Sequence, residues 1–213
     1  MTSPLRNVPP KASAMIETLR GLGYSTGSAL ADLIDNSITA GATEVNVAFC
    51  WNGPASMITV LDNGSGMDDG ELERAMRLGE RSPLDPRGGN DLGRFGIGLK
   101  TASFSQCRRL TVATCKDGST HCLRWDLDVL AASADGAWYL LEGPAPGSQF
   151  LLDRLRTTGT LVAWEVLDRI VTPDATQQDF LDLIDRTEHH LAMVFHRYLQ
   201  GPNPRLRLTI NDR

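Results

Sequence analysis

The sequence predicts an α/β fold, because one amphipathic helical segment is followed by short segments with the pattern of β-strands. Residues 28–39 form the helical segment, and its apolar residues recur at helical spacing as one stripe: Leu30, Leu33, Ile34 and Ile38. Residues 43–49 alternate apolar and polar side chains, and residues 57–61 form a short apolar run, so both segments are predicted strands. The turn-forming residues 52–54 between them predict a hairpin.

The composition is that of an ordinary globular protein. The 213 residues are 41% hydrophobic and 22% charged, with a formal net charge of -5. This length suffices for one large domain, or for one domain and the start of another. Dedicated nucleic-acid-binding domains are usually basic, so this acidic chain does not resemble one. The first 13 residues lack the apolar region of a signal peptide, and no apolar run approaches membrane-spanning length. We therefore expect a cytoplasmic protein that does not bind a membrane.

The four cysteines are Cys50, Cys107, Cys115 and Cys122. They contain no CxxC pair, which argues against a zinc site. The last three lie in or beside apolar runs, so we expect buried thiols in a reducing compartment.

The other elements are predicted in chain order. Residues 1–12 are a proline-containing extended arm, and residues 12–22 are a first helix. Residues 69–78 and 97–106 are predicted helices, whereas 110–114, 121–125, 138–141 and 160–166 are predicted strands. A long helix is expected to start at residues 172–174 and to end before Pro202. Residues 205–210 alternate like a strand, and we expect them to form half of an unpaired hairpin. The 213 residues would then be a fragment of a longer protein.

The polar face of residues 28–39 carries two acids and an amide. Asp32 and Asn36 lie one above the other, because residues four apart share one face of a helix. Asp35 points about 60° to the other side. Such a face is most often plain solvated surface. Two later motifs indicate that this one has a further role.

Both motifs are rich in glycine. Residues 62–67, DNGSGM, directly follow the strand 57–61, and residues 93–100, GRFGIGLK, open the helix 97–106. Residues 79–92 precede the second motif with glycine, proline and mixed charge, which predicts a loop of the length often used as a lid. Each motif alone is weak, because DNG is usually a turn and GxxGxG also marks dinucleotide-binding folds.

An acid–asparagine helix, then a strand ending in DxGxG, then GxxGxGxK, resembles the GHKL ATPases. This superfamily contains gyrase-type topoisomerases, ninety-kilodalton heat-shock chaperones, histidine kinases and MutL. The run DLIDNSITAGAT, residues 32–43, is most similar to the MutL and MORC branches, and the resemblance spans residues 29–165. It implies a two-layer α/β sandwich with a mixed, largely antiparallel sheet and helices on one face. It also implies a domain division into an arm (1–12), an ATPase domain (13–200) and the start of a transducer-like domain (201–213).

The resemblance implies ATP or ADP as ligand, bound with Mg²⁺. Asp62 would accept a hydrogen bond from the adenine amine, where guanine presents a carbonyl. Asn36 would ligate Mg²⁺, and Asp32 would orient the attacking water. Glycine amides at a helix start suit phosphate oxygens. The other expected nucleotide-binding residues are Gly64, Gly66, Met67, Gly93, Arg94, Phe95, Gly96, Ile97, Gly98, Leu99, Lys100 and Thr160.

Asp32 departs from the family pattern, which usually has glutamate there. Aspartate is one methylene shorter, so we expect slow hydrolysis or a helix that sits closer to the water. The leading hypothesis is an ATP-hydrolysing module that acts as a nucleotide-driven switch. In the full-length protein it would form an ATP-dependent homodimer, with DNA bound through further domains, in genome maintenance or anti-phage defence. The alternatives are a histidine-kinase-type ATP-binding domain, or a module that binds nucleotide with little or no turnover.

Overall fold

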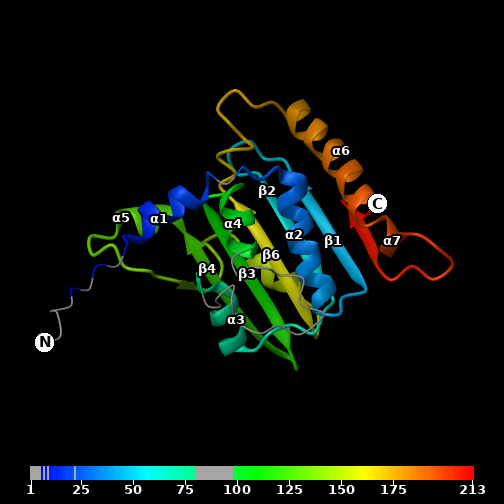
Figure 1. Cartoon of the computed structure of the whole chain (residues 1–213), viewed down its shortest axis with the longest axis horizontal. Coiled ribbons are helices and arrows are strands. Elements are labelled where there is room, and N and C mark those ends of the chain that lie inside the picture. Colours follow the sequence, from blue (N-terminus) through cyan, green and yellow to red (C-terminus); the bar gives the residue numbers. More distant parts are fainter. Residues whose placement is uncertain (1–5, 7, 9, 22, 80–97) are drawn as a thin grey trace, which may run out of the picture.

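The computed structural model describes residues 6, 8, 10–21, 23–79 and 98–213, and a seven-stranded sheet forms its centre (Figure 1). The strand order is β5-β4-β3-β6-β2-β1-β7. The strands are β1 (Glu44–Cys50), β2 (Met57–Asp62), β3 (Arg109–Lys116), β4 (Ser119–Asp126), β5 (Leu141–Glu142), β6 (Gly159–Glu165) and β7 (Arg207–Ile210). Neighbouring strands are antiparallel except β1 and β7, which are parallel. The predicted mixed, largely antiparallel sheet is confirmed, as is the β1–β2 hairpin.

Helices pack on one face of the sheet, which confirms the predicted two-layer α/β architecture. They are α1 (Ala12–Leu19), α2 (Thr26–Thr39), α3 (Asp69–Met76), α4 (Gly98–Phe104), α5 (Leu127–Ala132), α6 (Gln177–Val194) and α7 (His196–Leu199). Helices α2 and α4 lie side by side across the middle of this face, and α6 packs on the other side of α2 (Figure 1). Among the described helices, none combines the length and apolar character that a membrane span needs.

The core lies between α2 and the sheet. The apolar stripe of α2 faces inward, and Leu30, Leu33 and Ile34 are at most 3% exposed. On β2, Ile58 and Val60 point into the same core, because successive strand residues alternate between the two faces. Helix α2 starts two residues before the predicted segment, after Ser25, whose hydroxyl accepts the N–H of Ser28 at 3.1 Å.

The second face of the sheet has a small cover of its own. The 3₁₀-helix η1 (Gln149–Arg154) lays Leu151 against Leu161 and Ala163 of β6. Arg154, at the end of η1, donates from its guanidinium to the Thr59 hydroxyl of β2 at 2.9 Å. The cavity described below lies on this second face.

Two predicted elements are displaced. The predicted strand 138–141 is wrong, because β5 comprises only Leu141–Glu142, and Trp138 instead packs edge-to-face on Trp125. The long helix does not start at residues 172–174. It starts at Gln177, because Thr176 and Asp179 form a reciprocal capping box, and it is interrupted at Phe195 between α6 and α7.

Strand β7 corrects the expected unpaired hairpin. It pairs in parallel with β1, from Glu44 opposite Arg207 to Val47 opposite Ile210. Leu208 and Ile210 pack against the core on the helix side. The alternating pattern of residues 205–210 predicts a strand but not its partner, which lies about 160 residues away in the chain. The division at residues 200 and 201 into two domains stays a prediction.

We predict that Gly159→Ala destabilises the junction between β6 and β2. Gly159 has φ +126°, and a Cβ there would lie 2.1 Å from the Asp62 carbonyl oxygen. The backbone clash adds to the cost of the left-handed conformation, so the free energy of unfolding should fall by about 3 kcal/mol or more. Denaturant titration measures it.

Gly143→Ala is the matched control. Gly143 also has a positive φ, +75°, but a Cβ there meets no atom within 4 Å. It should therefore cost only the backbone term, about 1–2 kcal/mol. Equal losses in the two variants would show that the close approach at Gly159 does not matter.

Candidate functional site

The carboxylate of Asp62, the last residue of β2, is held by three elements at once. Its Oδ1 accepts the N–H of Gly64 at 2.8 Å and the N–H of Thr160 at 3.2 Å. Its Oδ2 accepts the hydroxyl of Ser37, on α2, at 2.8 Å. A carboxylate has about four acceptor positions, so among the described residues one position on Oδ2 is left for a further donor.

Burial is the main influence on this carboxyl group. It raises the pKa of Asp62, and the hydrogen bonds from Gly64, Ser37 and Thr160 act in the opposite direction. The charged form is therefore short of solvation, although it is well oriented. A ligand N–H at the remaining position would stabilise it.

Thr114 of β3 fixes the residues beside Asp62. Its hydroxyl donates to the Gly159 carbonyl at 3.1 Å and accepts the Met67 N–H at 2.9 Å. It also lies 3.2 Å from the hydroxyl of Thr160. One strand side chain thus ties the glycine-containing loop after β2 to the start of β6.

The loop after β2 approaches the sheet more closely than a side chain allows. Gly66 has φ +67°, and a Cβ there would lie 2.0 Å from the Cys115 carbonyl oxygen. Gly64 is buried, and a Cβ there would lie 3.0 Å from Ala40 Cβ at the end of α2. Gly66 therefore brings the loop against β3, and Gly64 brings it against the end of α2 and the Asp62 carboxylate.

The polar face of α2 continues the site toward α4. Asp32 Oδ2 accepts the Tyr24 hydroxyl at 3.0 Å and lies 3.7 Å from the position of a Cβ on Gly98, the first residue of α4. Asn36, one turn later, is exposed, and its side-chain amide has no hydrogen-bond partner among the described residues. Asp35 is separate: burial, followed by the charge of Asp32, raises its pKa.

The second glycine motif is described only from Gly98 onward. The expected nucleotide-binding residues Gly93, Arg94, Phe95, Gly96 and Ile97 lie outside the described residues, as does the predicted lid from residue 80 on. Leu99 packs against the core. Lys100 is 2% exposed, and its ammonium group donates to the Ala75 carbonyl of α3 at 2.8 Å. The nucleotide-binding roles of these residues stay predictions.

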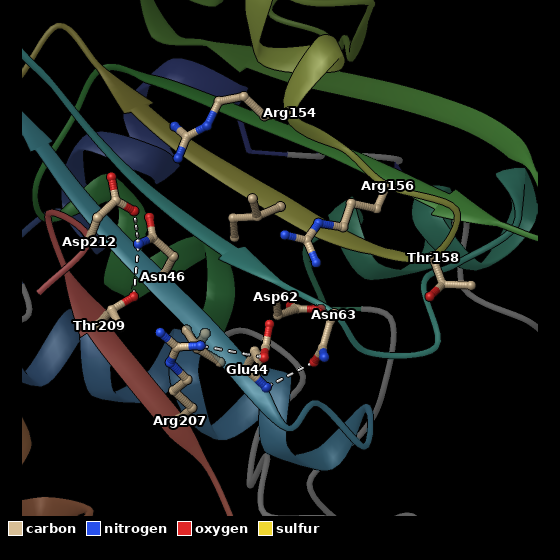
Figure 2. A pocket seen from close by; sticks show the side chains of 12 residues that line it. Glu44, Asn46, Asp62, Asn63, Arg154, Arg156, Thr158, Arg207, Thr209 and Asp212 are labelled. Atoms are coloured by element: carbon tan, nitrogen blue, oxygen red, sulfur yellow. Dashed lines mark hydrogen bonds and ion pairs between the residues drawn. The ribbon is translucent and has the colours of Figure 1, made fainter.

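A separate cavity of about 270 Å³ lies on the other face of the sheet (Figure 2). Arg154 and Arg156 extend over it from the segment that leads to β6, and Glu44 and Arg207 line its opposite side. Asp62 contributes to the lining, although its carboxylate is held by Ser37 on the helix side of the sheet. This cavity contains neither Asp32 nor Asn36.

Comparison with known proteins identifies the family of this chain. Residues 24–156 match the family described as histidine kinase-, DNA gyrase B-, and HSP90-like ATPase. The chain belongs to this ATPase family. The matched range contains Asp32, Asn36, Asp62 and the whole second glycine motif, whereas Thr160 lies just beyond it.

Curated relatives carry the names of the MutL and MORC branches. The chain is 30% identical to the DNA mismatch repair protein MutL of Rhodospirillum rubrum over 187 residues, which is 87% of this chain and 26% of that protein. It is 32% identical to ATPase morc-1 of Caenorhabditis elegans and 32% identical to ATPase MORC2B of Mus musculus, over 43% and 45% of this chain and 10% of each relative. The chain thus spans about a quarter or less of these relatives.

Three residues that make contacts in the site were not predicted from the sequence motifs. Ser37 binds Asp62, Thr114 fixes Met67, and Tyr24 binds Asp32. Of the three, only Ser37 lies within a motif, directly after Asn36, so its position could have indicated a role. Thr114 lies in a predicted strand whose sequence indicates only a buried core. Tyr24 lies between glycines that indicate only a break between two helices.

We predict that Asp62 makes stability decrease as the pH rises through its titration. Its pKa is raised in the folded state, so the folded protein binds the proton more tightly than the unfolded chain. This contribution is present below the unfolded pKa, about 4, and is lost above the folded one. In Asp62→Asn the amide oxygen still accepts both backbone N–H groups. The unfolding free energy of the variant minus that of the parent should therefore be larger at about pH 7 than at about pH 4. Urea unfolding at both pH values measures this, and a constant difference would contradict it.

Proposed function

We propose that this chain is an Mg²⁺-dependent ATP-binding and ATP-hydrolysing module that acts as a nucleotide-driven dimerisation switch. Membership of the ATPase family supports the nucleotide class. The observation that carries the proposal is the arrangement of Asp62 and Asp32. Asp62 meets α2 near its C-terminal end through Ser37, and Asp32 faces Gly98 five residues earlier on the same helix.

Adenine is the base that suits Asp62. The remaining acceptor position of its Oδ2 suits one N–H of the C6 amine of adenine, where guanine has a carbonyl. A carbonyl facing this carboxylate would leave a buried acceptor unpaired and repelled. Thr160 is tied to Asp62 through its N–H, so it would lie at the same end of the base.

Phosphates and metal would lie toward α4. The side-chain oxygen of Asn36 is a hard ligand of the kind Mg²⁺ takes, and the described residues give it no competing partner. Such an ion would supply electrostatic stabilisation of phosphate charge. The amides around Gly98, together with those of Gly93 and Gly96, are proposed to bind phosphate oxygens, with Lys100 as an added charge.

Asp32 is proposed to orient the attacking water. Its Oδ2 is engaged by Tyr24, whereas its Oδ1 has no hydrogen-bond partner among the described residues. That oxygen can accept a proton of a water molecule and polarise it for in-line attack. The shorter arm of aspartate favours a low rate, and a module with little turnover is the second candidate function.

The wider role is proposed from the relatives. Since the relatives' names include DNA mismatch repair protein MutL and ATPase MORC2B, we propose work on DNA, in genome maintenance or anti-phage defence, through parts of the protein beyond this chain. Homodimerisation upon ATP binding and a cytoplasmic location belong to the same proposal.

We predict that Asp62→Asn reverses the choice of base. The parent should bind ATP at least about tenfold more tightly than GTP, because only adenine donates to Asp62. The asparagine amide nitrogen donates instead of accepting, so ATP binding should weaken and GTP should gain. Calorimetry with both nucleotides and Mg²⁺ measures this. Asp117→Asn, in the exposed β3–β4 turn, is the control and should not change the preference. Equal affinity of the parent for ATP and GTP would refute the role of Asp62.

We predict that Asp32→Asn separates hydrolysis from binding. Asparagine keeps the size and removes the negative charge, so ATP affinity should stay within about threefold while phosphate release falls by about 10²-fold or more. Asp35→Asn, three residues along the same helix, is the matched control and should be much milder. Asp32→Glu restores the residue common in the family and should raise the rate if the short arm limits it. Parent-like hydrolysis by Asp32→Asn in the full-length protein would exclude Asp32 as the catalytic acid.

A further inference from the structure

Tyr24 is hydrogen-bonded to the Asp32 carboxylate. It lies in the segment between α1 and α2, eight residues before Asp32, and its hydroxyl donates to Asp32 Oδ2 at 3.0 Å. The same Oδ2 lies closest to Gly98 at the start of α4. The phenol therefore engages the one carboxylate of α2 that faces the phosphate end of the proposed site.

Both the ring and the backbone of Tyr24 are anchored. The ring is half-buried and packs against the main core. The backbone carbonyl accepts the side-chain amide of Gln106 at 3.3 Å, and the Gln106 amide oxygen accepts the hydroxyl of Thr26 at 2.7 Å. Gln106 is 3% exposed and follows the C-terminal end of α4. The segment is thereby fixed to both α2 and α4.

The hydroxyl remains a donor. Burial raises the pKa of Tyr24, the hydrogen bond to Asp32 raises it further, and the Thr101 hydroxyl acts in the opposite direction. A phenol with a raised pKa stays protonated at neutral pH, so it cannot take the place of Asp32 as the proton acceptor. Thr101 belongs to α4, so the phenol also links Asp32 to that helix.

We infer that Tyr24 is a positioning residue for Asp32, and this inference rests on the proposed role of Asp32 in hydrolysis. An aspartate side chain turns about two bonds, and a hydrogen bond to Oδ2 restricts both torsions. Oδ1 is then held in one direction, toward the water, without any contact between Tyr24 and the nucleotide. A short aspartate cannot adjust its reach, so a fixed orientation matters more for it than for a longer glutamate.

Tyr24→Phe tests this inference because it removes only the hydroxyl and keeps the ring in the core. In the full-length protein we expect kcat for ATP to fall by about tenfold, the scale of one lost hydrogen bond to a charged group. KM, ATP affinity and the melting temperature should change little. The matched control is Tyr139→Phe, which also removes a hydroxyl that donates to an aspartate, Asp135, at an exposed position. It should leave kcat unchanged.

A double-mutant cycle separates positioning from a general structural effect. In the Asp32→Asn background, Tyr24→Phe should change kcat by less than about twofold, because there is no carboxylate left to orient. An equal tenfold loss in both backgrounds would overturn the inference. The inference would also be overturned if Asp32→Asn is slow but Tyr24→Phe hydrolyses ATP as fast as the parent. That result would leave the proposed function intact. A fast Asp32→Asn variant would instead remove the proposed catalytic role, and the inference with it.

Discussion

The hydrogen bonds to the Asp62 carboxylate are the constraint on which the rest of the structure depends. They join the end of β2, the loop after it, the start of β6 and the helix α2 around one partly desolvated group. Two glycines allow close backbone packing around this group, because a Cβ on Gly66 would clash with Cys115 and one on Gly159 would clash with Asp62. A charged group held in this way has its acceptor positions fixed before any ligand arrives, and that preorganisation is what base selection requires.

Helix α2 carries this constraint to the second half of the site. Its apolar stripe is buried on the sheet, so its polar face has no freedom to rotate. Ser37 holds it near Asp62, and Asp32 lies against α4, where Tyr24 joins the two helices. A shift of α4 would therefore move Asp32 through its contacts with Gly98 and Tyr24. Arg20 adds a further link, because this 2% exposed side chain donates to the Phe104 carbonyl at the end of α4 and pairs with Asp168 beyond β6.

The sequence predicts what is local and periodic. The helix around residues 28–39, the β1–β2 hairpin and the β3–β4 pair are confirmed, because a repeat of 3.6 or 2 residues directly reflects burial on one side. The predicted long helix starts at the wrong place, since the capping box of Thr176 and Asp179 decides it. The parallel partner of β7 and the short elements α5 and η1 lack such a signal. In the site, Asp62 belongs to a recognisable motif, whereas Ser37 and Thr114 contribute through contacts between residues 25 and 47 positions apart, which no local pattern contains.

The central claim is that ATP binds on the helix side of the sheet, between Asp62 and the start of α4. Amide hydrogen exchange of the chain with and without a non-hydrolysable ATP analogue and Mg²⁺ tests it most directly, because residues near the two sites can be followed separately. The account predicts slower exchange in residues 64–67 and in the N–H groups of Thr160 and Leu99. It predicts no change in residues 207–212, of which Arg207, Thr209 and Asp212 line the cavity on the other face (Figure 2). Protection of residues 207–212, with 64–67 unchanged, would place the nucleotide on the other face of the sheet and contradict the account.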